Sequence, residues 1–183
     1  MRATEDIKHE HRVVEVVLPV LDRMADGLER GNALSREHLE NALEFLRVFV
    51  DKCHHGKEER HLFGMLESRG VSRQVGLLSE LLREHGQGRA HVRALMQSYP
   101  TAIDGDPAAG RTFAEHARGY TNLLRMHIGK EDTKLVLLAD QTLSAEDDAE
   151  LVEQFERLER DEIGEGAHEK YHRMAHELAR AVG

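Results

Sequence analysis

The chain has few of the residues that define several common classes of site. Cys53 is its only cysteine, which excludes an internal disulfide and any zinc or iron–sulfur site held by several cysteines. No apolar run approaches the roughly 20 residues that a membrane-spanning helix needs. The polar start, MRATEDIKHEHR, also lacks the apolar segment of a secretory signal. We therefore expect a cytoplasmic protein that does not enter a membrane.

Positive charge is scarce as well. The 25 lysines and arginines are outnumbered by 34 aspartates and glutamates, and the formal net charge is −9. Because nucleic-acid binding needs a basic face that neutralises phosphates, this balance argues against a nucleic-acid partner. The 183 residues suffice for one domain, or for one domain with an appendage. Histidine is abundant by contrast, with 13 residues.

Strand patterns and helix breakers are rare, which predicts an all-α protein. There are three prolines, and no segment alternates apolar and polar residues with the period of a strand. Two helix starts are well marked, by Asp106 before Pro107 and by Ser144 three residues before Asp147. We expect an up-down-up-down four-helix bundle over residues 1–140, with helices near 4–29, 35–67, 73–98 and 107–140. A C-terminal extension over 141–183, with helices near 145–160 and 166–181, is expected to pack on it.

Helical periodicity indicates which histidines face the core. Residues spaced three and four apart form one apolar stripe on each helix. On the second helix this stripe includes His54 and Glu58 and leaves out His55 and Glu59. The stripes of the four helices together select His11, His54, Glu58, His85, His127 and Glu131. We expect solvated positions for His9, His38, His55, His91 and His116, and we expect Glu59 and Asp132 to be surface charges or hydrogen-bond acceptors behind the inner residues.

The heights of the inner residues along an antiparallel bundle can be compared. His11 lies about as far before the first turn as His54 lies after it, and His54 and His85 are similarly placed around Gly70. These three histidines are therefore expected in one layer. His127 fits less well with the expected end of the third helix, so either the fourth helix starts well beyond that end or the expected bounds are misplaced.

Four imidazoles and two carboxylates in one buried layer imply bound cations. A buried carboxylate without a partner is costly, so two of them require either protonation or positive charge nearby. Histidine and glutamate four residues apart project from the same helix face, where both can bind one metal or the carboxylate can bridge to a second. Six ligands do not saturate two octahedral ions. Positions would therefore remain for a bridging oxygen and for a small ligand.

The motifs that carry these residues are EHR (10–12), HHGKEERHLF (54–63), EHGQGR (84–89) and HIGKED (127–132). Their order and spacing resemble the hemerythrin-like, or HHE cation-binding, domain. The resemblance implies a four-helix bundle that holds an oxo- or hydroxo-bridged pair of non-haem iron ions on the six residues named above. It also implies a protein that binds or senses O2, NO or peroxide at open iron positions. An enzyme that decomposes peroxide or reactive nitrogen species, or an iron donor for cluster repair, is the alternative.

One departure from the family bears on oxygen carriage. Oxygen-carrying hemerythrins take two histidines, four residues apart, from the third helix, and Arg89 stands four residues after His85 here. We therefore expect the reduced centre to react irreversibly with oxygen. Because six ligands leave coordination positions open, we expect the oxidised centre to accept small anions such as azide.

Other readings stay open at this point. His61 and His168 lie on inner stripes, and either could supply a seventh ligand or a hydrogen bond behind one. The C-terminal helices could instead cover an apolar face or form a homodimer interface. A ferritin-like oxidase would use Glu-x-x-His pairs, which occur at 58–61, 165–168 and 169–172, but histidines stand where its lone glutamates should be. A structural bundle without metal is the remaining alternative.

Overall fold

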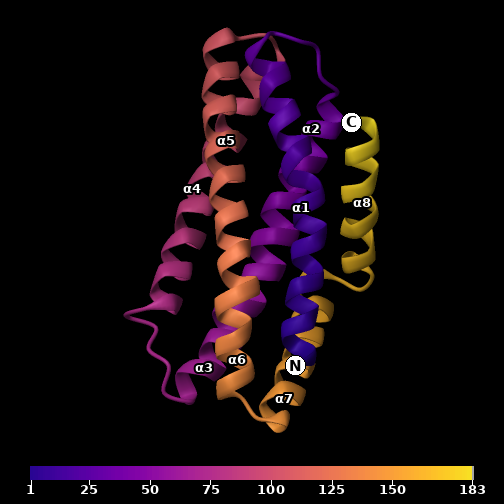
Figure 1. Cartoon of the computed structure of the whole chain (residues 1–183). Helices are drawn as coiled ribbons and strands as arrows, with labels where there is room; N and C mark the ends of the chain where they lie inside the picture. Colours follow the sequence, from indigo (N-terminus) through magenta and orange to yellow (C-terminus); the bar gives the residue numbers. More distant parts are fainter. Residues whose placement is uncertain (183) are drawn as a thin grey trace.

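The computed structural model describes residues 1–182, and all regular structure in that range is helical, so the expected all-α class is confirmed (Figure 1). The first bundle helix is α1 (Arg2–Glu29) and the third is α4 (Leu77–Ile103). The second bundle helix runs over 36–68 as α2 (Arg36–Glu44), η1 (Phe45–His54), η2 (Lys57–Leu62) and α3 (Phe63–Ser68). The fourth runs over 107–142 as α5 (Pro107–Lys130), η3 (Glu131–Leu135) and α6 (Val136–Thr142).

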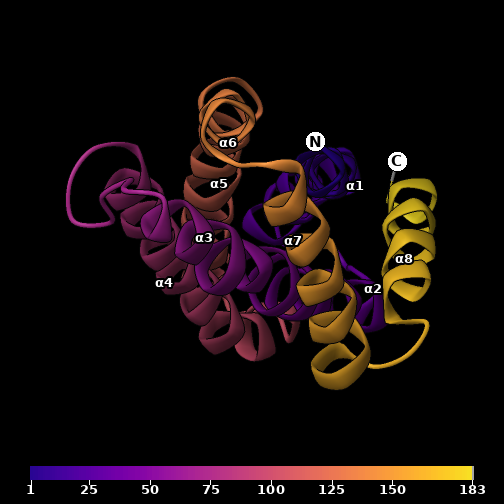
Figure 2. The same ribbon diagram turned by 90° about the horizontal axis from the view of Figure 1, so that it is seen from below.

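The C-terminal extension consists of α7 (Ala145–Leu158), η4 (Glu159–Ile163) and α8 (Ala167–Ala181). Helix α8 lies beside α1 and the second bundle helix, and α7 crosses the end of the bundle near the N-terminus (Figures 1 and 2). The predicted capping box starts α7: the Ser144 hydroxyl accepts from the Asp147 amide at 3.2 Å, and the Asp147 carboxylate accepts from the Ser144 amide at 2.9 Å.

The expected bounds of the third helix were wrong. The helix starts four residues later than predicted and continues to Ile103, with Pro100 inside it. Proline removes one backbone hydrogen bond and favours a bend, but it does not have to end a helix near its last turn. With this end, His85 lies 18 residues before Ile103, and His127 lies 20 residues after Pro107. The misfit in height therefore disappears.

Three π-helical segments interrupt the second and fourth bundle helices, at η1, η2 and η3. Backbone hydrogen bonds in a π-helix join residues five apart, so each turn holds more residues than an α-turn, and such turns are frequent at functional sites. His54 is the last residue of η1, Glu58 lies in η2 and Glu131 is the first residue of η3. The period of 3.6 used to assign inner positions therefore fails locally in these segments.

Two apolar clusters lie on either side of the level at which the inner histidines sit. One cluster contains Val14 and Phe49, and the other contains Ile7 and Phe63. On α1 the chain passes from Ile7 through His11 to Val14, so a polar layer separates the two clusters. None of the helices formed by residues 1–182 combines the length and apolar content required to cross a bilayer.

Candidate metal centre

All four bundle helices contribute to one buried polar layer. It contains the six residues selected by periodicity, each no more than 2% exposed: His11, His54, Glu58, His85, His127 and Glu131. The Glu131 carboxylate lies 3.2 Å from Nε2 of His11 and 3.1 Å from Nε2 of His127. The Glu58 carboxylate lies 3.4 Å from Nε2 of His85 and 3.8 Å from Nε2 of His54. Each carboxylate therefore stands between histidines of different helices.

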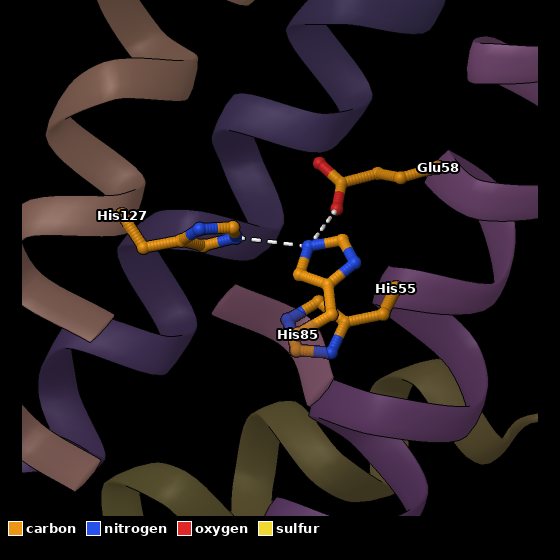
Figure 3. A group of neighbouring side chains, drawn as sticks. All are labelled: His55, Glu58, His85 and His127. Carbon is orange, nitrogen blue, oxygen red and sulfur yellow. Dashed lines mark hydrogen bonds and ion pairs between the residues drawn. The ribbon is translucent and has the colours of Figure 1, made fainter. Parts of the chain in front are cut away.

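The potential donor atoms form two adjacent groups, and within each group they lie within 4.8 Å of one another. One group comprises His11, His54, Glu58 and Glu131, and the other comprises His55, Glu58, His85 and His127. Figure 3 shows the second group, in which Nε2 of His85 and Nε2 of His127 converge to 2.9 Å. Glu58 belongs to both groups, so its carboxylate lies between the donor atoms of the two sets of histidines.

His55 belongs to the layer, and the expectation that it would be solvated was wrong. Its side chain is 3% exposed, and its ring stacks on that of His85 at 3.9 Å between centroids. His55 lies between the π-helical segments η1 and η2. The widened turns bring two successive residues, His54 and His55, to the inner face, which a regular α-helix does not do.

The layer contains most of the unpaired buried polar atoms of residues 1–182. Among the eight buried side-chain nitrogens and oxygens without a hydrogen-bond partner, seven are here: Nε2 of His11, both ring nitrogens of His55, and both carboxylate oxygens of Glu58 and of Glu131. Buried polar atoms are normally paired, so a cluster of orphans requires an explanation. Imidazole nitrogens and carboxylate oxygens facing one another fit a first-row transition metal.

A carboxylate from a neighbouring helix orients each of four inner histidines. The Nδ1 atoms of these histidines lie within hydrogen-bond distance of Glu10 (His54, 2.9 Å), Glu59 (His85, 2.8 Å), Glu84 (His127, 2.9 Å) and Asp132 (His11, 2.7 Å). Because an ionised carboxylate only accepts, Nδ1 carries the proton of each ring when it is neutral, and Nε2 would then offer its lone pair to a metal ion in the layer. Hydrogen bonds of this kind fix metal-binding histidines and raise their basicity.

These four contacts form a closed ring around the bundle. Each bundle helix supplies the carboxylate for the histidine of the next helix in chain order, and the fourth helix supplies Asp132 to His11 on the first. A cation from the same helix as the histidine then pairs with each carboxylate: Lys57 with Glu10, Arg89 with Glu59, Lys130 with Glu84, and Arg12 with Asp132. Each of the four carboxylates is thus paired with a cation.

The four motifs also contain the acidic residues of this ring, which helical periodicity does not select. In each motif an acidic residue is the direct neighbour of an inner residue: Glu10 precedes His11, Glu59 follows Glu58, Glu84 precedes His85 and Asp132 follows Glu131. Glu59 and Asp132 are acceptors behind inner histidines, which was one of the two roles considered for them. Glu10 and Glu84 were missed.

In the metal-free protein, neighbouring imidazoles and carboxylates shift the pKa values of His11 and Glu131. Burial alone would lower the pKa of His11, but the hydrogen bond to Asp132 and the close Glu131 carboxylate outweigh it and raise this pKa to about 10. Burial raises the pKa of Glu131, yet the charge of His127 and the close contact with His11 hold this pKa well below its usual value. Metal ions entering the layer would therefore replace protons on the imidazoles.

The two additional candidates lie outside the donor groups of the layer. His61 is beside the ring of Phe155, at 6.3 Å between centroids. Nε2 of His168, on α8, lies 3.6 Å from Oε1 of Glu10. His168 therefore contacts the carboxylate behind His54 and does not face the layer itself.

Residues 2–139 match the sequence profile of the Hemerythrin HHE cation binding domain. This match covers most of the chain, so the chain belongs to that family and the resemblance read from its motifs is confirmed. Three relatives, one from Mycobacterium bovis and two from Mycobacterium tuberculosis, are 23% identical over 181 residues, which is 99% of this chain and 70% of theirs. All three are described as uncharacterized proteins. No solved structure matches the chain significantly.

Proposed function

We propose that this protein binds two iron ions in the buried layer and takes up O2, NO or peroxide at open iron positions. The observation that carries the proposal is the sharing of carboxylates between two donor groups: Glu58 belongs to both, and Glu131 contacts His11 of one and His127 of the other. Membership of a cation-binding family and a donor set of imidazoles and carboxylates support iron.

The bound pair would supply a redox-active centre with exchangeable coordination positions. The chain contributes the rest. The ring of outer carboxylates holds Nε2 of four histidines toward the layer, and the burial of the layer keeps bulk water away. The two apolar clusters above and below the layer restrict access to small molecules.

The test is anaerobic purification and iron reconstitution, followed by elemental analysis and visible spectra before and after air and azide. We expect about two irons per chain, an azide-dependent absorption band and irreversible oxidation by air. His54→Ala should lose iron, whereas His38→Ala, on α2 and outside both donor groups, should not. One zinc per chain, or no metal in the reconstituted protein, would contradict the proposal.

The same preparation separates binding from catalysis. A sensor or binding protein takes up peroxide or NO stoichiometrically, whereas the alternative enzyme consumes either in many turnovers per centre. Delivery of iron to an apo iron–sulfur protein would identify the iron donor instead.

A further inference from the structure

His55 is a buried histidine whose polar atoms are not accounted for by packing. It projects from the second bundle helix into the layer, and neither ring nitrogen has a hydrogen-bond partner. A donor atom of His55 lies within 4.8 Å of donors from Glu58, His85 and His127 (Figure 3). Leaving a buried polar atom unpaired costs about 1–3 kcal/mol. An apolar side chain would therefore be favoured here if the position served only to fill space.

We propose that His55 is a fifth imidazole ligand, bound to the same metal ion as His85 and His127. The inference rests on the proposed two-iron function and makes the two halves of the centre unequal. Three imidazoles, the carboxylates of Glu58 and Glu131, and a bridging oxygen would saturate an octahedral ion. The other ion, held by His11 and His54, keeps one open position. Small ligands therefore bind on the His11 and His54 side.

A carboxylate also lies near Nδ1 of His55, as for the other four inner histidines, but at a longer distance. Nδ1 of His55 faces Oδ1 of Asp51, four residues earlier on the same helix, at 3.6 Å. This distance is too long for a hydrogen bond in the metal-free protein, but Nδ1 is also the atom through which the other four histidines contact their carboxylates. Nε2 is then the nitrogen left to bind metal.

Arg89 connects His55 with this arrangement. Its Nη1 atom lies 2.8 Å from Glu59 and 3.1 Å from Asp51, and these two carboxylates stand behind His85 and His55. One guanidinium thus pairs with the carboxylates behind two stacked imidazoles. Arg89 stands four residues after His85 on the third helix, and in the proposed centre the second helix supplies the fifth imidazole.

The decisive variant is His55→Phe, which keeps an aromatic ring in the stack with His85 and cannot bind metal. Its matched control is His116→Phe on α5, a histidine outside the layer. Iron content is measured first, and azide is then titrated against visible absorption. We expect one azide per pair of irons in the wild type and the control. His55→Phe should bind two azide ions per pair of irons, because the second ion then also has an open position. If that ion is lost, the variant should retain only the iron held by His11 and His54.

Several outcomes would overturn the inference. His55→Phe with two irons, one azide and an unchanged spectrum would show that His55 only stacks, while the two-iron proposal would stand. Two azides on the wild type would also overturn it. A wild type without iron would instead contradict the proposed function itself.

A second variant keeps the test decisive if His55→Phe does not fold. His55→Gly leaves a space that free imidazole can occupy. Added imidazole should return the azide stoichiometry from two per pair of irons to one. A folded, iron-loaded His55→Gly protein that is indifferent to imidazole, and that binds one azide throughout, would refute His55 as a ligand.

Discussion

His54 and Glu10 lie on neighbouring helices, and Nδ1 of His54 donates a 2.9 Å hydrogen bond to Oε2 of Glu10. Oε1 of Glu10 accepts from Nζ of Lys57 at 2.5 Å, and Lys57 also pairs with Glu159 of η4. His168 of α8 lies near the same oxygen. The C-terminal extension therefore contacts the ring of outer carboxylates at Glu10. The extension thus contacts an inner histidine through one intervening carboxylate.

Glu10→Gln should weaken iron binding about 10–100-fold, because the amide holds the His54 ring less strongly than a carboxylate does. Competition with a chelator measures the effect. Glu156→Gln is the matched control: Glu156 lines the same cavity of about 200 Å³ but pairs with the exposed Arg2. Equal iron affinities for the two variants would show that Glu10 does not support His54.

Lys57→Met should lower the free energy of unfolding of the metal-free protein by about 3–5 kcal/mol, because Glu10 then stays buried without its cation. The double variant with Glu10→Gln should lose less than the sum of the two single changes. Urea denaturation of the chelator-treated wild type, both single variants and the double variant measures the four free energies of unfolding of this double-mutant cycle. Strict additivity would mean that the two side chains are not coupled.

His168→Ala should keep two irons per chain, because His168 contacts Glu10 and lies outside the donor groups of the layer. We expect only a shift of the visible spectrum, transmitted through Glu10 and His54. His176→Ala, an exposed change on the same helix, should leave the spectrum as it is. Loss of one iron from His168→Ala would make His168 a ligand.

Gly110→Ala should destabilise the fold by about 1–3 kcal/mol, because overpacking of a close contact strains the core. A Cβ atom at this position would lie 2.7 Å from the carbonyl oxygen of Leu28, on the backbone of α1. Gly129→Ala meets nothing within 4 Å and should stabilise helix α5 by up to ~1 kcal/mol. Thermal denaturation measures both changes. Melting temperatures that shift in the same direction for the two variants would contradict the close contact between α1 and α5 at Gly110.

Helical spacing predicted six residues of the layer, and three of them lie in regular α-helix. His11, His85 and His127 lie on α-helical stripes, and the structure brings all three into one layer with His54, Glu58 and Glu131. The order of the four motifs identified the family for the same reason, since spacing along a helix determines which side chains share a face.

By itself, then, the sequence determined the helical class, the order of the helices and six of the seven side chains of the layer. Tertiary structure decided the remainder. It allowed α4 to continue past Pro100 and widened the second bundle helix into π-turns, which turned His55 and Lys57 inward. It also chose the partner of each carboxylate, because Glu10 meets His54 only when two particular helices are neighbours. Period and spacing describe one helix at a time, whereas these contacts depend on how the helices pack together.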